Sequence, residues 1–328
     1  MPLPRKAVIG LMVDNLMKRG SVLPLSRRRA TAWARGLDIP EGGETVLYTG
    51  HMYQLMPIIA YMAKRLAALE NSRITRLMGL GRLANRVVGL SHFMIGVKKS
   101  DRQAADRTLR SIAGLLRAAG VEFGYLYGRE LYSGTLVYDQ GVDDVLAVHA
   151  ARVRDSLREA GVKRLITVDP HTTHMLRHVY PKVLGDFPVD VHSYLEVLSE
   201  KGLPLRHALG RSIVVHDSCV YARYEDTIDQ PRKLLLEAGA AVKEPRMTRR
   251  QTHCCGGPIE SLFPSRAHDI ASKRAEQLSG FGCPVATMCP ICLVNLRDSA
   301  NGNGPAFRDI ADILAEAFLE GPEFPVAE

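Results

Sequence analysis

The chain has 328 residues, of which 46% are hydrophobic and 24% are charged, and its formal net charge is +8. These values are ordinary for a globular protein, and the length suggests two domains that each bury a core without cross-links. The positive charge suits nucleic acid, an anionic membrane surface or an acidic partner. One Trp, eight Phe and no basic–aromatic RNA-binding signature make nucleic acid the weakest of these partners.

Neither a membrane span nor a signal peptide is expected from the sequence. No segment offers the roughly 18 uninterrupted apolar residues that cross a bilayer, and the N-terminal residues show no long apolar run with a small-residue cleavage site. Free thiols without an export signal favour a reducing compartment. We therefore expect a cytoplasmic protein.

The first 44 residues have the pattern of a helical arm. We expect a short helix over 9–18, a break at 20–24 and a basic helix over 26–35. Turn residues at 38–43 end the arm.

From residue 45 onward, apolar strand patterns alternate with amphipathic helices, which indicates parallel α/β layers. The first half predicts strands over 45–49, 121–123, 164–168 and 190–192, and helices over 53–69, 106–119, 143–160 and 194–201. The second half predicts strands over 211–216, 241–243 and 284–288, and helices over 230–238, 265–278, 290–297 and 305–319.

All six cysteines lie in the last third of the chain, and five of them form one pattern. Thirty-four residues separate the first cysteine of the pattern from an adjacent pair, and thirty-three separate that pair from a CxxC. Two adjacent thiols, a CxxC and one distant thiol are poor disulfide geometry but suit a soft metal centre, either iron–sulfur or zinc. The candidate ligands are Cys219, Cys254, Cys255, Cys289 and Cys292.

Residues around the thiols are suited to their negative charge. Pro290 favours the first position of a helix, so the CxxC is expected to open one with its free N–H groups toward the metal. Gly256 and Gly257 permit positive φ, which lets backbone amides turn toward sulfur. Nearby cationic or donor side chains are His216, Arg223, Arg249, Arg250 and His253.

A structural zinc site is the main alternative, although zinc takes four ligands and the pattern supplies five. Cys283 stands outside the pattern, at the start of a predicted strand. We interpret it as a small buried apolar side chain.

The second half repeats the first. The segment from Asp169 to Leu176 aligns with that from Cys289 to Leu296, each after an apolar strand. The gap between the first two aligned sites is eighty residues in the first half, forty-six more than in the second, which places an insertion near 65–102. The first-half counterparts of the five cysteines are His51, Tyr132, Ser133, Asp169 and Thr172.

The cysteine pattern resembles the CCG cysteine-rich domain of heterodisulfide reductase B and D subunits and of related iron–sulfur subunits. The sequence His216-Asp217-Ser218-Cys219 and the basic segment around Trp33 in the arm share this likeness. The resemblance implies two CCG-type α/β domains and a [4Fe–4S] cluster, noncubane in the best-described members, held by the five cysteines. Together with the internal repeat, it implies an arm over 1–44, a degenerate domain over 45–205 and a cluster-binding domain over 206–328.

The chain departs from that family at two points. The first copy has no thiols, so we expect one cluster and not two. His51, Asp169, His171 and His174 are then either a nitrogen- and oxygen-rich metal or substrate site, or polar residues kept in a degenerate domain. The chain also lacks a ferredoxin-type cysteine run, so a separate ferredoxin-like subunit is the expected electron partner.

The segment 64–99 carries eight Lys or Arg residues and one Glu. It could dock an acidic electron-transfer partner, pack on the first domain with a solvated basic face, or make peripheral contact with anionic lipid. No phosphate-binding fingerprint is present, so neither flavin nor nicotinamide is expected in this chain.

The sequence therefore predicts an iron–sulfur oxidoreductase subunit that is similar to heterodisulfide reductase and moves electrons through one cluster, with a disulfide or thiol as its substrate. The alternatives are an electron-transfer component of a hydroxy-acid or acyl-CoA dehydrogenase system, and a structural zinc-binding scaffold.

Overall fold

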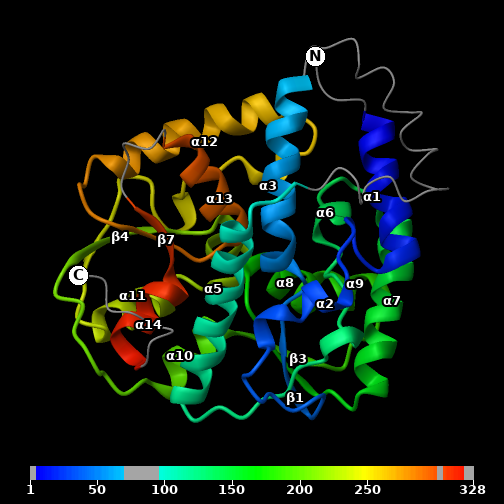
Figure 1. Ribbon diagram of the computed structural model, residues 1–328, viewed down its shortest axis with the longest axis horizontal. Helices are drawn as coiled ribbons and strands as arrows, with labels where there is room; N and C mark the ends of the chain where they lie inside the picture. Colours follow the sequence, from blue (N-terminus) through cyan, green and yellow to red (C-terminus); the bar gives the residue numbers. More distant parts are fainter. Residues whose placement is uncertain (1–4, 70–95, 301–305, 321–328) are drawn as a thin grey trace.

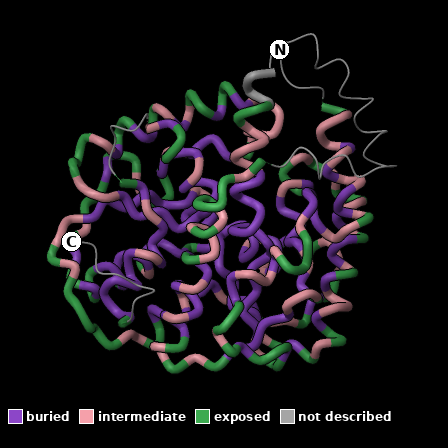
Figure 2. Tube along the Cα trace, viewed as in Figure 1, coloured by how far each residue is buried: buried purple, intermediate pink, exposed green. Residues whose placement is uncertain are grey.

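The computed structural model describes residues 5–69, 96–300 and 306–320. Two parallel β-sheets with helices packed against them make up the chain, which confirms the predicted α/β class (Figure 1). Buried residues fill the interior of both sheet regions and the zone between them (Figure 2).

The first sheet has the strand order β1–β2–β3, and both pairings are parallel. Each strand is only four residues long, and the last three residues of both β1 and β2 are buried. The strands are β1 (Thr45–Tyr48), β2 (Arg164–Thr167) and β3 (Asp190–Ser193). The helices after β1 in this half are α3 (Met52–Leu69), α6 (Thr135–Tyr138), α7 (Asp143–Glu159), α8 (Pro170–His174), α9 (Tyr180–Leu184) and α10 (Tyr194–Lys201).

The second sheet has the order β5–β4–β6–β7, again with parallel pairings throughout. Its strands are β4 (Ser212–His216), β5 (Ala241–Lys243), β6 (Val285–Thr287) and β7 (Phe307–Asp309). Its helices are α11 (Asp229–Glu237), α12 (Pro264–Ser279), α13 (Pro290–Ser299) and α14 (Ile310–Phe318).

One helix joins the two sheet regions. Helix α5 (Lys99–Ala118) runs through the middle of the molecule between them (Figure 1). Its side chains Leu109, Ile112 and Leu116 share one buried cluster with Leu47 of the first sheet and Ile213 of the second. Each such buried aliphatic side chain contributes about 1.5–3 kcal/mol relative to an exposed one. The two sheets are therefore held together by a common apolar core.

The N-terminal arm contains α1 (Arg5–Arg19), as predicted, but the basic helix is shorter than expected. Helix α2 (Arg27–Ala30) begins after Ser26, whose hydroxyl accepts from the Arg29 amide, and a 3₁₀ turn over Ala32–Ala34 follows it. Burial explains the break, because Trp33 is fully buried in the shared core. The predicted single helix over 26–35 is therefore wrong.

Two further predictions of local structure are wrong. Residues 121–123 form no strand, since the only pairings nearby are isolated bridges at Gly124 and Tyr125. The helix predicted over 305–319 begins only at Ile310, because β7 precedes it and Asp309 caps its N-terminus. A three-residue strand is too short to show a period of two in the sequence.

The predicted insertion over 65–102 lies largely outside the described residues, which resume at residue 96. The helix predicted over 106–119 starts earlier than expected, because α5 already begins at Lys99. Among the described residues, no helix is long and apolar enough to cross a membrane.

Candidate metal centre

Secondary structure places the five candidate cysteines at one edge of the second sheet. Cys219 follows the end of β4 by three residues, and Cys289 directly precedes α13, just after β6. Cys254 and Cys255 lie in the loop between β5 and α12. The carboxyl ends of neighbouring parallel strands lie at the same edge of a sheet, which is where α/β proteins commonly bind ligands.

The five sulfur atoms form a continuous series of contacts. Cys219 contacts Cys254, Cys254 contacts Cys255, Cys255 contacts Cys292, and Cys292 contacts Cys289. None of these thiols forms a disulfide. The structure therefore brings together the five side chains that the spacing singled out.

Cys283 differs from the five in position and in burial. It precedes β6 by two residues, and it is half-buried instead of buried as predicted. Its side chain packs at the margin of an apolar cluster. Cys283 is therefore less buried than predicted, because the chain enters β6 from an exposed turn at Phe281 and Gly282.

The site is closed on one side and open on the other. Cys255, Cys289 and Cys292 are at most 3% exposed, whereas Cys219 and Cys254 are partly exposed. The open edge is therefore formed by the two thiols at one end of the series.

The spread of the sulfur atoms can be compared with the geometry of a single zinc ion. Four thiolates around one zinc ion, with bonds of about 2.3 Å, would lie about 3.8 Å from one another. Among the described residues, three or more ligand atoms mutually within 4.8 Å occur only at His174, His178 and Glu225. No three of the five sulfur atoms meet that criterion, so the described cysteines form no preformed tetrahedral zinc site.

Two glycines allow the loop to approach the sulfur atoms. Gly256 has φ +82°, and its amide donates to the Cys254 sulfur at 3.3 Å. A Cβ at Gly257 would lie 2.3 Å from the Ile291 side chain and 3.6 Å from the Cys255 sulfur. The predicted positive φ occurs at Gly256 only. Gly257 is needed instead for close packing against α13.

The CxxC opens a helix, as predicted. Cys289 is the N-cap residue of α13 and Pro290 occupies the first turn. Burial opposes ionisation of Cys289, but hydrogen bonds from the Cys292 side chain and the His171 side chain, with a further one from the Cys292 amide, outweigh it and lower the thiol pKa well below its usual value. This helix start therefore favours a thiolate at Cys289.

The other thiol with a lowered pKa is Cys254. Hydrogen bonds from Cys219 and Cys255 lower its pKa to about 2, despite an opposing effect of burial. The corresponding donors, Cys219 and Cys255, have raised pKa values. Cys254 and Cys289 are thus the two thiols of the series whose pKa values are lowered, and thiolates are the form that binds iron.

A histidine from the first half reaches the cysteine site. His171 lies in the first turn of α8, after β2, and its imidazole donates to the Cys289 sulfur. Burial acts to lower the pKa of His171, but the contact with Cys289 reverses this and raises the pKa to about 9. The carboxyl ends of β2 and β6 therefore face each other across the site.

The second predicted site, formed by His51, Asp169, His171 and His174, does not assemble. His171 faces Cys289, His174 Nδ1 lies 2.7 Å from Glu225 Oε1, and His51 Nε2 lies 3.8 Å from a Glu130 oxygen. Asp169 caps α8 by accepting from the His171 amide. Of the two interpretations of these residues, a common metal site is wrong, because their side chains point to different neighbours.

The predicted cationic surroundings are only partly present. The side chains of Arg249 and Arg250 pair with Asp229 and Asp226, both at 2.7 Å. Burial and then the charge of Arg274 lower the pKa of His216 to about 3, so this imidazole is neutral. These three residues therefore provide little free positive charge for the thiolates.

Arg274 provides a positive charge that was not predicted from the sequence. It is fully buried in α12, its Nε donates to His216 Nδ1 at 3.2 Å, and it interacts electrostatically with Cys292. One of its terminal nitrogens is buried without a hydrogen-bond partner. Its position in the apolar stripe of α12, between Ala271 and Leu278, is the signal that could have found it.

Comparison with known proteins supports the same interpretation. Residues 213–297, which include all five cysteines, match the family model described as a cysteine-rich domain, CCG. The chain is 30% identical over 66% of its length to a probable membrane-anchored ferredoxin of Chromohalobacter salexigens. It is 29% identical over 69% of its length to a probable iron–sulfur-binding oxidoreductase, FadF, of Bacillus subtilis.

A third relative is the D-type subunit of the dihydromethanophenazine:CoB–CoM heterodisulfide reductase of Methanosarcina mazei, at 24% identity over 62% of this chain. The matched regions cover 34% of each of the first two relatives and 54% of the third, so the chain spans about a third of the first two. The chain therefore contains a CCG cysteine-rich domain and is similar to iron–sulfur oxidoreductases and to the D-type subunit of heterodisulfide reductase.

Proposed function

We propose that the chain is the iron–sulfur subunit of an oxidoreductase similar to heterodisulfide reductase, and that its five clustered cysteines hold one [4Fe–4S] cluster. The continuous series of sulfur contacts within a matched CCG domain is the observation that carries this proposal. When bound, such a cluster supplies reversible one-electron transfer. The proposed ligands are Cys219, Cys254, Cys255, Cys289 and Cys292.

A duplicated scaffold is part of the proposal, with an arm over 1–44 and α/β domains over 45–205 and 206–328. The order β1–β2–β3 matches β4–β6–β7. Gly134 and Gly256 have nearly the same φ and ψ, and Asp169 and Cys289 each precede a proline as N-cap residues. Because the first domain has Asp169 where the second has Cys289, the scaffold supports one cluster.

The chain's own residues hold the centre and limit access to it. His171, Arg274 and the amide of Gly256 place hydrogen bonds or positive charge near the sulfur atoms, which raises the reduction potential of such a centre. The partly exposed Cys219 and Cys254 leave one edge open. We assign that edge to the disulfide or thiol substrate and to the ferredoxin-like partner subunit.

A second candidate function is electron transfer without a substrate site, within a hydroxy-acid or acyl-CoA dehydrogenase system. Two relatives, named as a probable membrane-anchored ferredoxin and a probable iron–sulfur-binding oxidoreductase, favour the electron-transfer role, although their names specify no such dehydrogenase. Adding a disulfide to the reduced chain separates the two functions. If the disulfide oxidises the reduced chain and its reduced-state signal disappears, a substrate site is supported. An unchanged signal favours electron transfer alone.

A redox titration of the anaerobically purified chain, followed by electron paramagnetic resonance, tests the proposed function. We expect one signal that appears and disappears reversibly, with a more negative midpoint potential in His171→Phe, because that variant loses a hydrogen bond to the Cys289 sulfur. Exposed His207 provides the control, since His207→Phe should leave the potential unchanged. A chain with no redox signal would contradict the assignment. So would equal midpoint potentials in His171→Phe and His207→Phe.

A further inference from the structure

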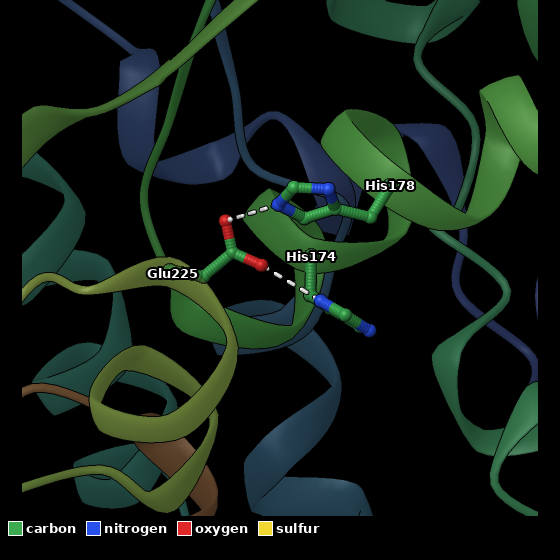
Figure 3. Close-up of side chains that lie close together, drawn as sticks. All are labelled: His174, His178 and Glu225. Atoms are coloured by element: carbon green, nitrogen blue, oxygen red, sulfur yellow. Dashed lines mark hydrogen bonds and ion pairs between the residues drawn. The ribbon is translucent and has the colours of Figure 1, made fainter. Parts of the chain in front are cut away.

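Two imidazoles and a carboxylate converge at a second place between the two sheets. His174 Nδ1 lies 2.7 Å from Glu225 Oε1, and His178 Nε2 lies 3.4 Å from Glu225 Oε2. One ligand atom from each of the three residues lies within 4.8 Å of the other two. Figure 3 shows both rings on one side of the carboxylate, each directed at a different oxygen.

The three side chains come from π-helical segments, or the turn next to one, in both halves of the chain. His174 ends α8 and His178 lies in the π-helix Met175–Val179, which continues from it. Glu225 is the last residue of a second π-helix, Tyr221–Glu225, in the other half. Single π-helical turns are rare and occur frequently at functional sites. Here one such turn from each half supplies ligand atoms to the same point.

The charge balance of the site favours a cation. The Glu225 side chain is fully buried, whereas His178 is half exposed. Arg177 also contacts Glu225, at 3.1 Å, but it is paired through both terminal nitrogens with Glu196. Glu225 therefore shares the Arg177 guanidinium with Glu196, so two carboxylates face one arginine. A buried carboxylate is costly unless a cation compensates it.

The ligand types and access indicate which cation. Two imidazole nitrogens and one carboxylate oxygen are typical zinc ligands, and three protein ligands leave a fourth position for water. Ligand atoms around zinc lie about 3.3 Å apart, so binding needs the 2.7 Å contact between His174 and Glu225 to open by a few tenths of an ångström. The exposed side of His178 provides a path from solvent.

We propose that His174, His178 and Glu225 bind one zinc ion, which clamps the first half of the chain to the second. This site is separate from the five cysteines: it has no sulfur ligand and takes no part in electron transfer. Its function is to fix the position of α8, which contains His171, relative to the π-helix that ends at Glu225 and begins two residues after Cys219.

Zinc stoichiometry tests the proposal directly. The cluster-loaded full chain is dialysed against a low concentration of zinc, and bound zinc is measured by mass spectrometry. We expect one more zinc per chain in the wild type than in His178→Ala. Because His178 is half exposed, this variant should fold. His207→Ala, at an exposed histidine outside the triad, should bind as much zinc as the wild type.

Two further measurements keep the test independent of the cysteines. Zinc should raise the melting temperature of the wild type but not that of His178→Ala or Glu225→Gln, since only the wild type binds it in the folded state. Cobalt in place of zinc should give visible d–d bands without a sulfur-to-cobalt charge-transfer band. Equal zinc binding by wild type and His178→Ala would overturn the proposal, as would a cobalt spectrum with sulfur ligands only.

Discussion

Replacing Cys255 by alanine should abolish cluster binding, with iron and acid-labile sulfide falling to near zero. Cys255 occupies the middle of the sulfur series, where it contacts both Cys254 and Cys292. It is 2% exposed, so no water or external thiol can take its place without rearrangement. The measurement is iron and sulfide per chain after anaerobic purification, together with circular dichroism to show that the fold is retained.

Cys283 provides the matched control for this experiment. It lies outside the sulfur series and is half-buried before β6. Cys283→Ala should keep the full iron and sulfide content. If Cys255→Ala retained its iron, or if both variants lost it equally, the assignment of the five ligands would be wrong.

Replacing Arg232 by methionine is expected to cost about 3–5 kcal/mol in the free energy of unfolding, because it leaves a buried carboxylate without its partner. Arg232 donates to both oxygens of Asp217, at 2.8 and 2.9 Å, and to both oxygens of Glu244. The side chains of Arg232 and Asp217 are 6% and 1% exposed. Urea denaturation followed by circular dichroism measures the loss.

Arg249 is the matched arginine on the surface. Its side chain pairs with exposed Asp229, whereas its backbone amide, which donates to Asp217, is unaffected by substitution. Arg249→Met should therefore cost at most about 1 kcal/mol. The double variant Arg232→Met, Asp217→Asn should recover part of the loss, because the unpaired charge is gone. A cost below about 1 kcal/mol for Arg232→Met would refute the buried-pair argument.

Most elements of the fold could be predicted where apolar residues recur periodically over enough residues to show a helix or strand pattern. Helix α10 and strand β5 occur at the predicted residues, whereas other long helices differ at their ends, by seven residues at the start of α5. The failures have local causes. Strand β7 has three residues, which show no periodicity, and the predicted helix over 26–35 is interrupted because Trp33 must enter the core. Tertiary packing decides such positions.

The candidate site could be predicted in its thiols but not in its neighbours. Cysteine spacing identified five side chains that the fold brings together. All five lie after strands or in a loop at the same edge of the second sheet. His171 was assigned to a different site, because only tertiary structure shows that the ends of β2 and β6 face each other. Arg274 was overlooked as part of an amphipathic helix, although a charged residue within its apolar stripe was a readable signal.

The central claim is that five cysteines hold one iron–sulfur cluster, and its most direct test is the iron, acid-labile sulfide and zinc content of the anaerobically purified chain. We predict about four iron and four sulfide per chain, as one [4Fe–4S] cluster requires. Zinc at His174, His178 and Glu225 is compatible with this result, because that site has no sulfur ligand. Zinc without iron or labile sulfide would contradict the claim and would make the cysteine site a structural zinc scaffold.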